Sequence, residues 1–384
     1  MSRRSKFALL MLVALPALAF ASIGCAGIAT PKGWASPVVT DGTLLIAHRD
    51  NLYAYDVVTL EPQWRFPSGD IKHGDIIALY GTPAAANGTV FVPTYDGTLF
   101  AVKLDDGSPV WAGPFKTGGP LVGGILVQNG TVYFGSSDGH LYAVDADSGT
   151  EKWAFKTAKE IWSTPVVVGD ALYVTSLDGK LYVLDAANGQ LRWSFKTDAG
   201  VAAAPIVDEA NGRVYVGGFD ARLRAIDLQT HEETWVVKAK NWFWSRPALE
   251  GGRLFAPSMD HHVYAVDSAT GNDAWDFKTD GVILAAPVSI GENLYVVDRD
   301  GNVYAIEQST GKAAFDKPLD VGGSVLSDLV VMDYKGAPTL VVLTTGGKAV
   351  LIDPDTLKIV HEFQVGGGPI AAATGTVSPT DSGG

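Results

Sequence analysis

The stretch AVDADSGTEKW, residues 143–153, recurs along the chain, and its recurrence decides the fold. The tryptophan position that ends it returns at intervals of 47, 42, 40, 42, 40, 40 and 46 residues. It is occupied by Trp64, Trp111, Trp153, Trp193, Trp235 and Trp275, then by Phe315 and His361, where the pattern decays. Because repeats of about 40 residues are typical of β-propeller blades, the spacing predicts eight consecutive blades.

Each position of this motif has a structural reason. The first position is small or apolar, and the third is usually aspartate. The seventh is glycine in five copies, Gly107, Gly149, Gly189, Gly271 and Gly311. Glycine supplies the positive φ that a tight hairpin turn needs, and a tryptophan buries a large apolar area against a neighbouring sheet. We therefore expect the six tryptophans to dock each blade onto the next, which is a structural role.

The repeat that spans residues 163–196 shows how each unit is built. It contains four short runs rich in Val, Leu, Tyr and Phe, separated by turn residues, as in a chain of hairpins. Asp-Gly pairs at 96–97, 138–139, 178–179 and 300–301 predict tight turns between second and third strands, and helical periodicity is absent. The prediction is an all-β, eight-bladed β-propeller of four-stranded antiparallel blades over residues 35–365, with first strands such as 165–168 innermost. The Gly-rich tail 366–384 is expected to help close the ring.

The first 24 residues have the layout of a signal peptide. Arg3, Arg4 and Lys6 precede an uncharged run, residues 7–24. Cleavage has two candidate sites, the small-x-small triplet at 19–21 and the lipobox-like residues 22–25, which end in the lipid-accepting cysteine.

Cys25 is the single cysteine of the chain, so no disulfide within the chain is possible. An unpaired thiol in an exported protein needs an explanation, and lipid attachment at Cys25 provides one. We expect a lipoprotein-type signal peptide over 1–24, then lipidated Cys25 at the start of a linker over 25–34. The protein is then held at the outer face of a membrane or the periplasmic side of an outer membrane. Ordinary secretion of a soluble protein and an uncleaved anchor are the alternatives.

Composition and charge narrow the class of partner. The formal net charge is −13, and phosphate backbones repel an acidic chain, so nucleic-acid binding is excluded. Apolar residues make up 47% of the chain and charged residues 18%, which indicates an ordered globular fold. A monomeric propeller is expected.

The sequence offers no catalytic constellation and no metal site. Residues 135–139, Gly-Ser-Ser-Asp-Gly, match a nucleophile pattern that works on a strand-to-helix turn, but here they overlie a hairpin. The seven histidines are scattered, and His261 and His262 are adjacent, so they point to opposite faces. We expect no catalytic residues and no metal ligands.

The motif Ala-x-Asp-x-x-x-Gly-x-x-x-Trp resembles the tryptophan-docking motif of pyrroloquinoline-quinone (PQQ) type propeller repeats. With eight such repeats behind a lipobox-like cysteine, the chain resembles the BamB family of outer-membrane assembly lipoproteins. This resemblance implies a non-catalytic scaffold that binds protein partners in the cell envelope, such as a component of an assembly machinery. Quinoprotein dehydrogenases share these repeats, but by family pattern they carry adjacent cysteines under the cofactor, and Cys25 stands alone. We therefore expect no cofactor. The alternative is a propeller that binds quinone or another small ligand, as a redox enzyme or extracellular sensor.

Two connectors between repeats are unusually aromatic. Most connectors are small, whereas residues 159–163 contain Trp162 and residues 240–246 contain Trp242, Phe243, Trp244 and Arg246. Aromatic and arginine side chains are the commonest binding hot spots. We therefore expect these five residues to form an apolar patch with a basic rim, where a partner binds. The alternative is that the aromatic residues plug the mouth of the channel. The longer connector over 69–76 is a second, weaker candidate.

Overall fold

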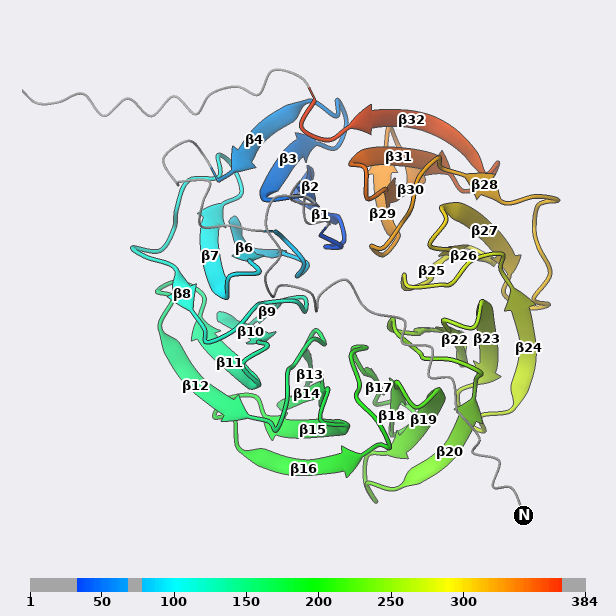
Figure 1. Cartoon of the computed structure of the whole chain (residues 1–384), viewed down its shortest axis with the longest axis horizontal. Coiled ribbons are helices and arrows are strands. Elements are labelled where there is room, and N and C mark those ends of the chain that lie inside the picture. Colours follow the sequence, from blue (N-terminus) through cyan, green and yellow to red (C-terminus); the bar gives the residue numbers. More distant parts are fainter. Residues whose placement is uncertain (1–32, 68–77, 368–384) are drawn as a thin grey trace, which may run out of the picture. The chain divides into compact units, whose positions relative to one another are not determined.

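The computed structural model describes residues 33–67 and 78–367, which form eight four-stranded antiparallel sheets arranged in a ring (Figure 1). The predicted fold class is confirmed. In every sheet the strands pair in chain order, so each sheet is one blade made from consecutive strands. The first strand of each blade lies nearest the centre of the ring and the fourth lies outermost, as β13 and β16 show (Figure 1).

Blades 1 to 4 carry the first half of the strands. They are β1 (Val38–Thr40), β2 (Thr43–His48), β3 (Asn51–Asp56) and β4 (Pro62–Phe66); β5 (Ala84–Ala86), β6 (Thr89–Pro93), β7 (Thr98–Lys103) and β8 (Phe115–Lys116); β9 (Leu126–Gln128), β10 (Thr131–Gly135), β11 (His140–Asp145) and β12 (Glu151–Lys156); and β13 (Val166–Val168), β14 (Ala171–Ser176), β15 (Lys180–Asp185) and β16 (Leu191–Lys196).

Blades 5 to 8 carry the second half. They are β17 (Ile206–Asp208), β18 (Arg213–Gly217), β19 (Arg222–Asp227) and β20 (Glu233–Lys238); β21 (Ala248–Glu250), β22 (Arg253–Pro257), β23 (His262–Asp267) and β24 (Asp273–Lys278); β25 (Val288–Ile290), β26 (Asn293–Val297), β27 (Asn302–Glu307) and β28 (Leu319–Asp320); and β29 (Val330–Tyr334), β30 (Ala337–Leu343), β31 (Lys348–Asp353) and β32 (Lys358–Gln364).

The motif spans the hairpin between the third and fourth strands. In blade 3, Ala143 pairs directly with Trp153, and a β-bulge follows at Val144. The same pairing of a small or aliphatic first residue with the tryptophan position recurs in blades 1, 4, 5 and 6. The carboxylate of Asp145 accepts N–H groups of the turn, including that of Ser148 at 3.0 Å, so the aspartate stabilises the turn that the glycine permits.

The hydrophobic core is divided among the junctions between blades. One buried cluster joins Tyr133 and Leu141 of blade 3 to Leu172 and Leu184 of blade 4. Equivalent clusters occupy the other junctions, so each blade is stabilised mainly by its two neighbours.

The outer strands of blades 2 and 7 are short. β8 and β28 contain two residues each, whereas the other outer strands contain five to seven. Pro114 and Pro318 stand immediately before them, and proline cannot donate a ladder hydrogen bond. Only the isolated bridges Val102–Pro109 and Ile306–Ala313 continue these two hairpins.

Blades 8 and 1 meet without exchanging a strand among the described residues. The N–H of Asp328 donates to Ser36 Oγ at 3.1 Å, and the N–H of Gly366 donates to the Tyr55 hydroxyl at 2.9 Å. A buried cluster with Leu60 and Leu351 fills the space behind these hydrogen bonds. Residues 368–384 of the tail, which is expected to help close the ring, lie outside the described residues.

Three further sequence hypotheses fall outside the part of the chain that the structure describes. They concern the signal peptide over 1–24, lipidated Cys25 and the connector over 69–76. Within residues 33–67 and 78–367, no helix is long and apolar enough to cross a membrane.

Candidate functional site

The docking tryptophans reach across the junctions between blades. Trp64 of blade 1 donates its indole N–H to the carbonyl of Leu104 in blade 2 at 2.6 Å, and its ring covers Gly107, where a Cβ would lie 2.8 Å from the ring. The same hydrogen bond to the next blade is made by Trp111, Trp153, Trp235 and Trp275. The glycine therefore provides a positive φ, +70° for Gly107, and also room for the indole.

Trp193 docks differently from the other five. The next blade places His231, not glycine, at the seventh position, with φ of 62°. The Trp193 and His231 rings stack, with centroids 4.3 Å apart and planes inclined by 14°. The junction between blades 4 and 5 therefore replaces a ring-on-glycine contact with a ring-on-ring contact.

One end of the propeller carries both the connectors between blades and the hairpins that join second and third strands, because the strands alternate in direction. We call this end the connector face. Side chains along the connector of residues 240–246 alternate between the core and this face. Phe243 and Ser245 are buried, whereas Trp242 and Trp244 are half-buried and Arg246 is exposed.

Phe243 does not belong to an exposed patch, and the sequence expectation is wrong at this residue. Its side chain is completely buried, packed on Gly217 and 5.9 Å from the Tyr264 ring between blades 5 and 6. The equivalent connector residues are buried and apolar too: Leu79, Leu121, Ile161, Val201, Ile283 and Val325. Phe243 fills a core position of the repeat, and aligning the connectors reveals that pattern.

The two remaining tryptophans of this connector form a stack with a residue from the neighbouring hairpin. Phe219, in the β18–β19 turn, lies 4.6 Å from the Trp242 ring and 5.6 Å from the Trp244 ring, with interplanar angles of 24° and 9°. We call these three residues the aromatic stack. The carbonyl of Trp242 accepts the N–H of Met259 at 2.9 Å, so the next hairpin holds the connector in place. A pre-ordered apolar surface results.

Trp162 lies two blades before the aromatic stack, at the connector position that Trp244 occupies. Its indole N–H donates to Ser137 Oγ at 3.1 Å, and its side chain is half-buried. Nothing in the described structure brings Trp162 into ring contact with Trp242 or Trp244. Trp162, Trp242 and Trp244 therefore lie on one face, but not in one cluster.

Sequence reasoning missed Phe219 and a second aromatic group on the connector face. Trp34 lies edge-to-face with Tyr80 at 4.4 Å, and Tyr80 lies 4.8 Å from Tyr95. Tyr95 and Phe219 occupy the same hairpin position, immediately before the turn aspartate. Aligning the hairpins as well as the connectors identifies both residues as neighbours of a connector.

Arg246 stands two residues before the innermost strand of blade 6, as Asp328 does before that of blade 8. Burial raises the pKa of the Asp328 carboxyl. Two interactions partly offset this rise: the hydrogen bond from the Ala286 N–H, at 2.7 Å, and the charge of Arg246. Arg246 therefore already lies within the electrostatic reach of an internal carboxylate.

The residues around the centre do not fit a quinone cofactor held together with a calcium ion, which the resemblance to quinoprotein dehydrogenases would imply. Positions equivalent to Asp328 hold Ser36, Thr82, Gly124, Thr164, Ala204, Arg246 and Ala286, so Asp328 is their single carboxylate. Within residues 33–67 and 78–367, no three His, Cys, Asp or Glu side chains gather where they would hold a metal ion. The acidic ligand set that such a group requires is not assembled there.

Comparison with known families agrees with the repeat pattern. Residues 26–112, 48–162, 156–241 and 220–380 match the family described as outer membrane protein assembly factor BamB. The chain belongs to this family. The resemblance inferred from the tryptophan motif is thereby confirmed. No curated protein matches the chain in sequence.

Solved structures share the fold of this BamB-family chain at low sequence identity. BamB from Moraxella catarrhalis is 16% identical with a TM-score of 0.67, over 81% of this chain and 91% of that chain. The computationally designed Ika8 protein is 14% identical with a TM-score of 0.66, over 82% and 94%. A europium-containing methanol dehydrogenase is 12% identical with a TM-score of 0.68, over 80% and 82%. Because a designed protein and an enzyme match equally well, these similarities show the fold alone.

Proposed function

We propose that the protein is an exported, lipid-anchored scaffold without catalytic activity, which binds a protein partner through the aromatic stack on its connector face. Membership of a family described as an outer membrane protein assembly factor supports an envelope location and a partner in that assembly machinery. The observation that carries the proposal is the stack of Phe219, Trp242 and Trp244, which no blade junction needs for docking.

Two physical features make the aromatic stack suitable for binding. Its rings come from blades 5 and 6 and are held against one another before a partner arrives, so little side-chain entropy is lost on association. Half-buried aromatic rings also offer large apolar areas that a partner can cover. Leu177 and Met259 are half-buried at the equivalent hairpin positions of blades 4 and 6, the two neighbours of blade 5.

The partner chemistry differs from the sequence expectation in one respect. Because the charge of Arg246 already acts on the Asp328 carboxyl, we do not assign Arg246 the role of a basic rim. The partner segment is instead apolar, with aliphatic or aromatic side chains that pack on Trp242 and Trp244.

A double variant, Trp242→Ala with Trp244→Ala, tests the proposal. Crosslinking and pull-down from native membranes should recover a protein partner with the unaltered chain and not with the double variant. The thermal melting curve should change little, because both side chains are half-buried and outside the interblade clusters. The control Phe243→Ala should unfold at lower temperature, because Phe243 is fully buried. A double variant that melts early and still captures the partner identifies the tryptophans as structural residues.

The lipid anchor is tested separately. Cys25→Ser should move the protein from the membrane fraction to the soluble fraction, because stable attachment requires the acyl chains. Intact-mass measurement of a mature chain that begins at Ser22 with a free thiol contradicts this part of the proposal.

A further inference from the structure

Blade 5 departs from the repeat at a residue of its third strand. At this position Tyr142, Tyr182 and Tyr264 donate their hydroxyls to the turn aspartate four residues earlier, at 2.8, 2.6 and 2.7 Å. Their rings also fill the junction with the preceding blade, as Phe155 and Tyr182 do with centroids 5.4 Å apart. Blade 5 has Arg224 instead.

Arg224 is held by three carboxylates and still has one unused nitrogen. Its Nη2 lies 2.5 Å from Asp220 and 3.3 Å from Asp198, and its Nε lies 2.9 Å from Glu233. The side chain is only 3% exposed. Its Nη1 is buried and has no hydrogen-bond partner among the described residues. A buried cationic N–H without an acceptor is unfavourable.

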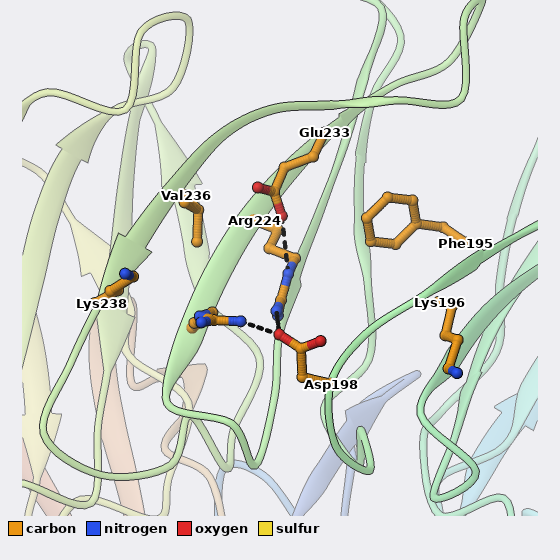
Figure 2. A pocket seen from close by; sticks show the side chains of 8 residues that line it. Phe195, Lys196, Asp198, Arg224, Glu233, Val236 and Lys238 are labelled. Carbon is orange, nitrogen blue, oxygen red and sulfur yellow. Dashed lines mark hydrogen bonds and ion pairs between the residues drawn. The ribbon is translucent and has the colours of Figure 1, made fainter.

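A pocket of about 290 Å³ opens beside Arg224, between the outer strands of blades 4 and 5. Figure 2 shows the guanidinium between Glu233 and Asp198, at the middle of the pocket. Phe195 and Lys196 project from β16 on one side, and Val236 and Lys238 from β20 on the other. The lining is completed by Arg222, which forms an ion pair with Asp198.

Buried ion pairs are generally no more stabilising than well-packed neutral residues of similar size. The tyrosines of the neighbouring blades show that a neutral side chain satisfies this position and its turn aspartate. The arginine is therefore not required for the fold, which points to a role in binding.

We propose that this pocket binds the carboxylate of a small ligand that also has an apolar body. The carboxylate would lie beside the Arg224 guanidinium, within reach of the ammonium groups of Lys196 and Lys238, while Phe195 and Val236 contact the apolar part. Charge supports a single negative group: four cations and two carboxylates line the pocket, although the whole chain carries −13. A pocket of this volume lies at the lower end of small-molecule sites, so the ligand is of the size of one amino-acid residue or a short-chain acid.

Two sources can supply this chemistry, the C-terminal residue of a peptide and a free short-chain carboxylic acid. We would titrate the full-length protein, followed by NMR, with hexanoate and with a capped tripeptide that ends in leucine and has a free C-terminus. The same tripeptide with an amidated C-terminus is the ligand control. Both acids should bind at this pocket, and the amide should bind at least tenfold more weakly.

The deciding variant is Arg224→Tyr, which restores the residue of the neighbouring blades. It should fold, and it should weaken binding of both acids at least tenfold. Arg192→Gln is the matched control, because it removes one positive charge from an exposed ion pair outside the pocket, with Asp170 and Asp185. The affinity of the Arg192→Gln variant for both acids should remain within twofold of that of the unaltered protein. Arg224→Lys, which keeps the charge without the forked guanidinium, provides a second test should the tyrosine variant not fold, and it too should weaken binding.

The outcomes separate the two sources and can overturn the proposal. Tenfold tighter binding of the tripeptide assigns the pocket to a peptide end, and tenfold tighter binding of hexanoate assigns it to a free acid. Comparable binding of the two supports the carboxylate chemistry that they share. Unchanged binding by Arg224→Tyr, equal binding of the amide, or equally strong competition by inorganic phosphate contradicts the carboxylate site. The aromatic stack takes no part in this experiment. A negative result at the Arg224 pocket therefore leaves the proposed scaffold function unaffected.

Discussion

Six junctions between blades hold a tryptophan, whereas the two junctions on either side of blade 8 do not. Where the tryptophan is present, the next blade usually offers glycine, and the ring lies directly on it, as Trp153 lies on Gly189. At the junction of blades 7 and 8, Phe315 packs instead against a buried cluster that includes Leu357. At the junction of blades 8 and 1, His361 is exposed and Leu60 is buried among residues of blade 8.

This difference shows that the tryptophan position of one blade and the glycine position of the next blade vary together. Leu60 and Leu357 replace glycine although their φ angles are 59° and 50°, in a region unfavourable for a side chain with a Cβ. The larger side chain fills the volume that a smaller or absent ring leaves. Tryptophan with glycine, and a smaller residue with leucine, are therefore two ways to fill one junction.

Removing a docking ring should give the largest loss of stability. Trp64→Ala should cost about 3–5 kcal/mol in the free energy of unfolding, because it removes a buried ring and a hydrogen bond to Leu104. His361→Ala should cost less than about 1 kcal/mol, because that side chain is exposed. Denaturant melts of both variants measure the difference, and equal losses contradict the comparison.

Changing both Gly189 and Trp153 should reveal the energetic coupling between the glycine and the ring that lies on it. Gly189→Leu should destabilise by about 2–3 kcal/mol, because even a Cβ would lie 2.5 Å from the Trp153 ring. In a Trp153→Phe background the same change should cost at least about 1 kcal/mol less, because the smaller ring leaves room. A double-mutant cycle by denaturant unfolding measures this coupling. Additive losses indicate that Leu60 and Leu357 do not compensate for a lost tryptophan.

Blade 5 offers a smaller test at the ring-on-ring junction. His231→Gly removes the stack on Trp193 but relieves the positive φ of 62°. Both effects are of about 1 kcal/mol and opposite in sign, so the free energy of unfolding should change by less than about 1 kcal/mol. A loss above about 2 kcal/mol in denaturant melts shows that the histidine is the main docking residue of this junction.

The turn aspartates should give the smallest effect, visible only in acid. Hydrogen bonds from the Ser148 N–H and hydroxyl, aided by Lys152, lower the pKa of Asp145 to about 2 from an ordinary value of 3.8. A lowered folded-state pKa adds stability above pH 3.8, and this contribution is lost as the pH falls from there through about 2. Asp145→Asn should therefore lose less stability than the unaltered protein over that interval. Because the carboxylate is one-third exposed, the two proteins should differ in this loss of stability by less than about 1 kcal/mol. Identical profiles of stability against pH for the two proteins contradict the prediction.

The sequence predicted the blades well because each blade repeats a local pattern. The spacing of Trp64 to His361 predicts eight units, and the structure contains eight blades. The first strand expected at 165–168 is observed as β13 at Val166–Val168. Hairpins form between adjacent segments, so local turn chemistry and period-two patterns contain most of the necessary information.

The candidate site was predicted less well because it depends on contacts between different hairpins. Phe243 looked like Trp242 and Trp244, yet its position alternates into the core. Phe219 stands in a turn without the Asp-Gly signal and meets the tryptophans only after folding. Arg224 is visible as an exception only when the equivalent tyrosines of the neighbouring blades are known to donate to the turn aspartate.

Site-directed photocrosslinking tests the central claim most directly, since it reports what touches the aromatic stack. A photoreactive phenylalanine analogue placed at Phe219 should form an adduct with one envelope protein, and Trp242→Ala with Trp244→Ala should abolish the adduct. The same analogue at Val58, a 55% exposed residue of the β3–β4 turn at the opposite end of the propeller, should give none. Adducts at Val58 and not at Phe219, or an adduct at Phe219 that survives the double substitution, contradict the proposed binding surface.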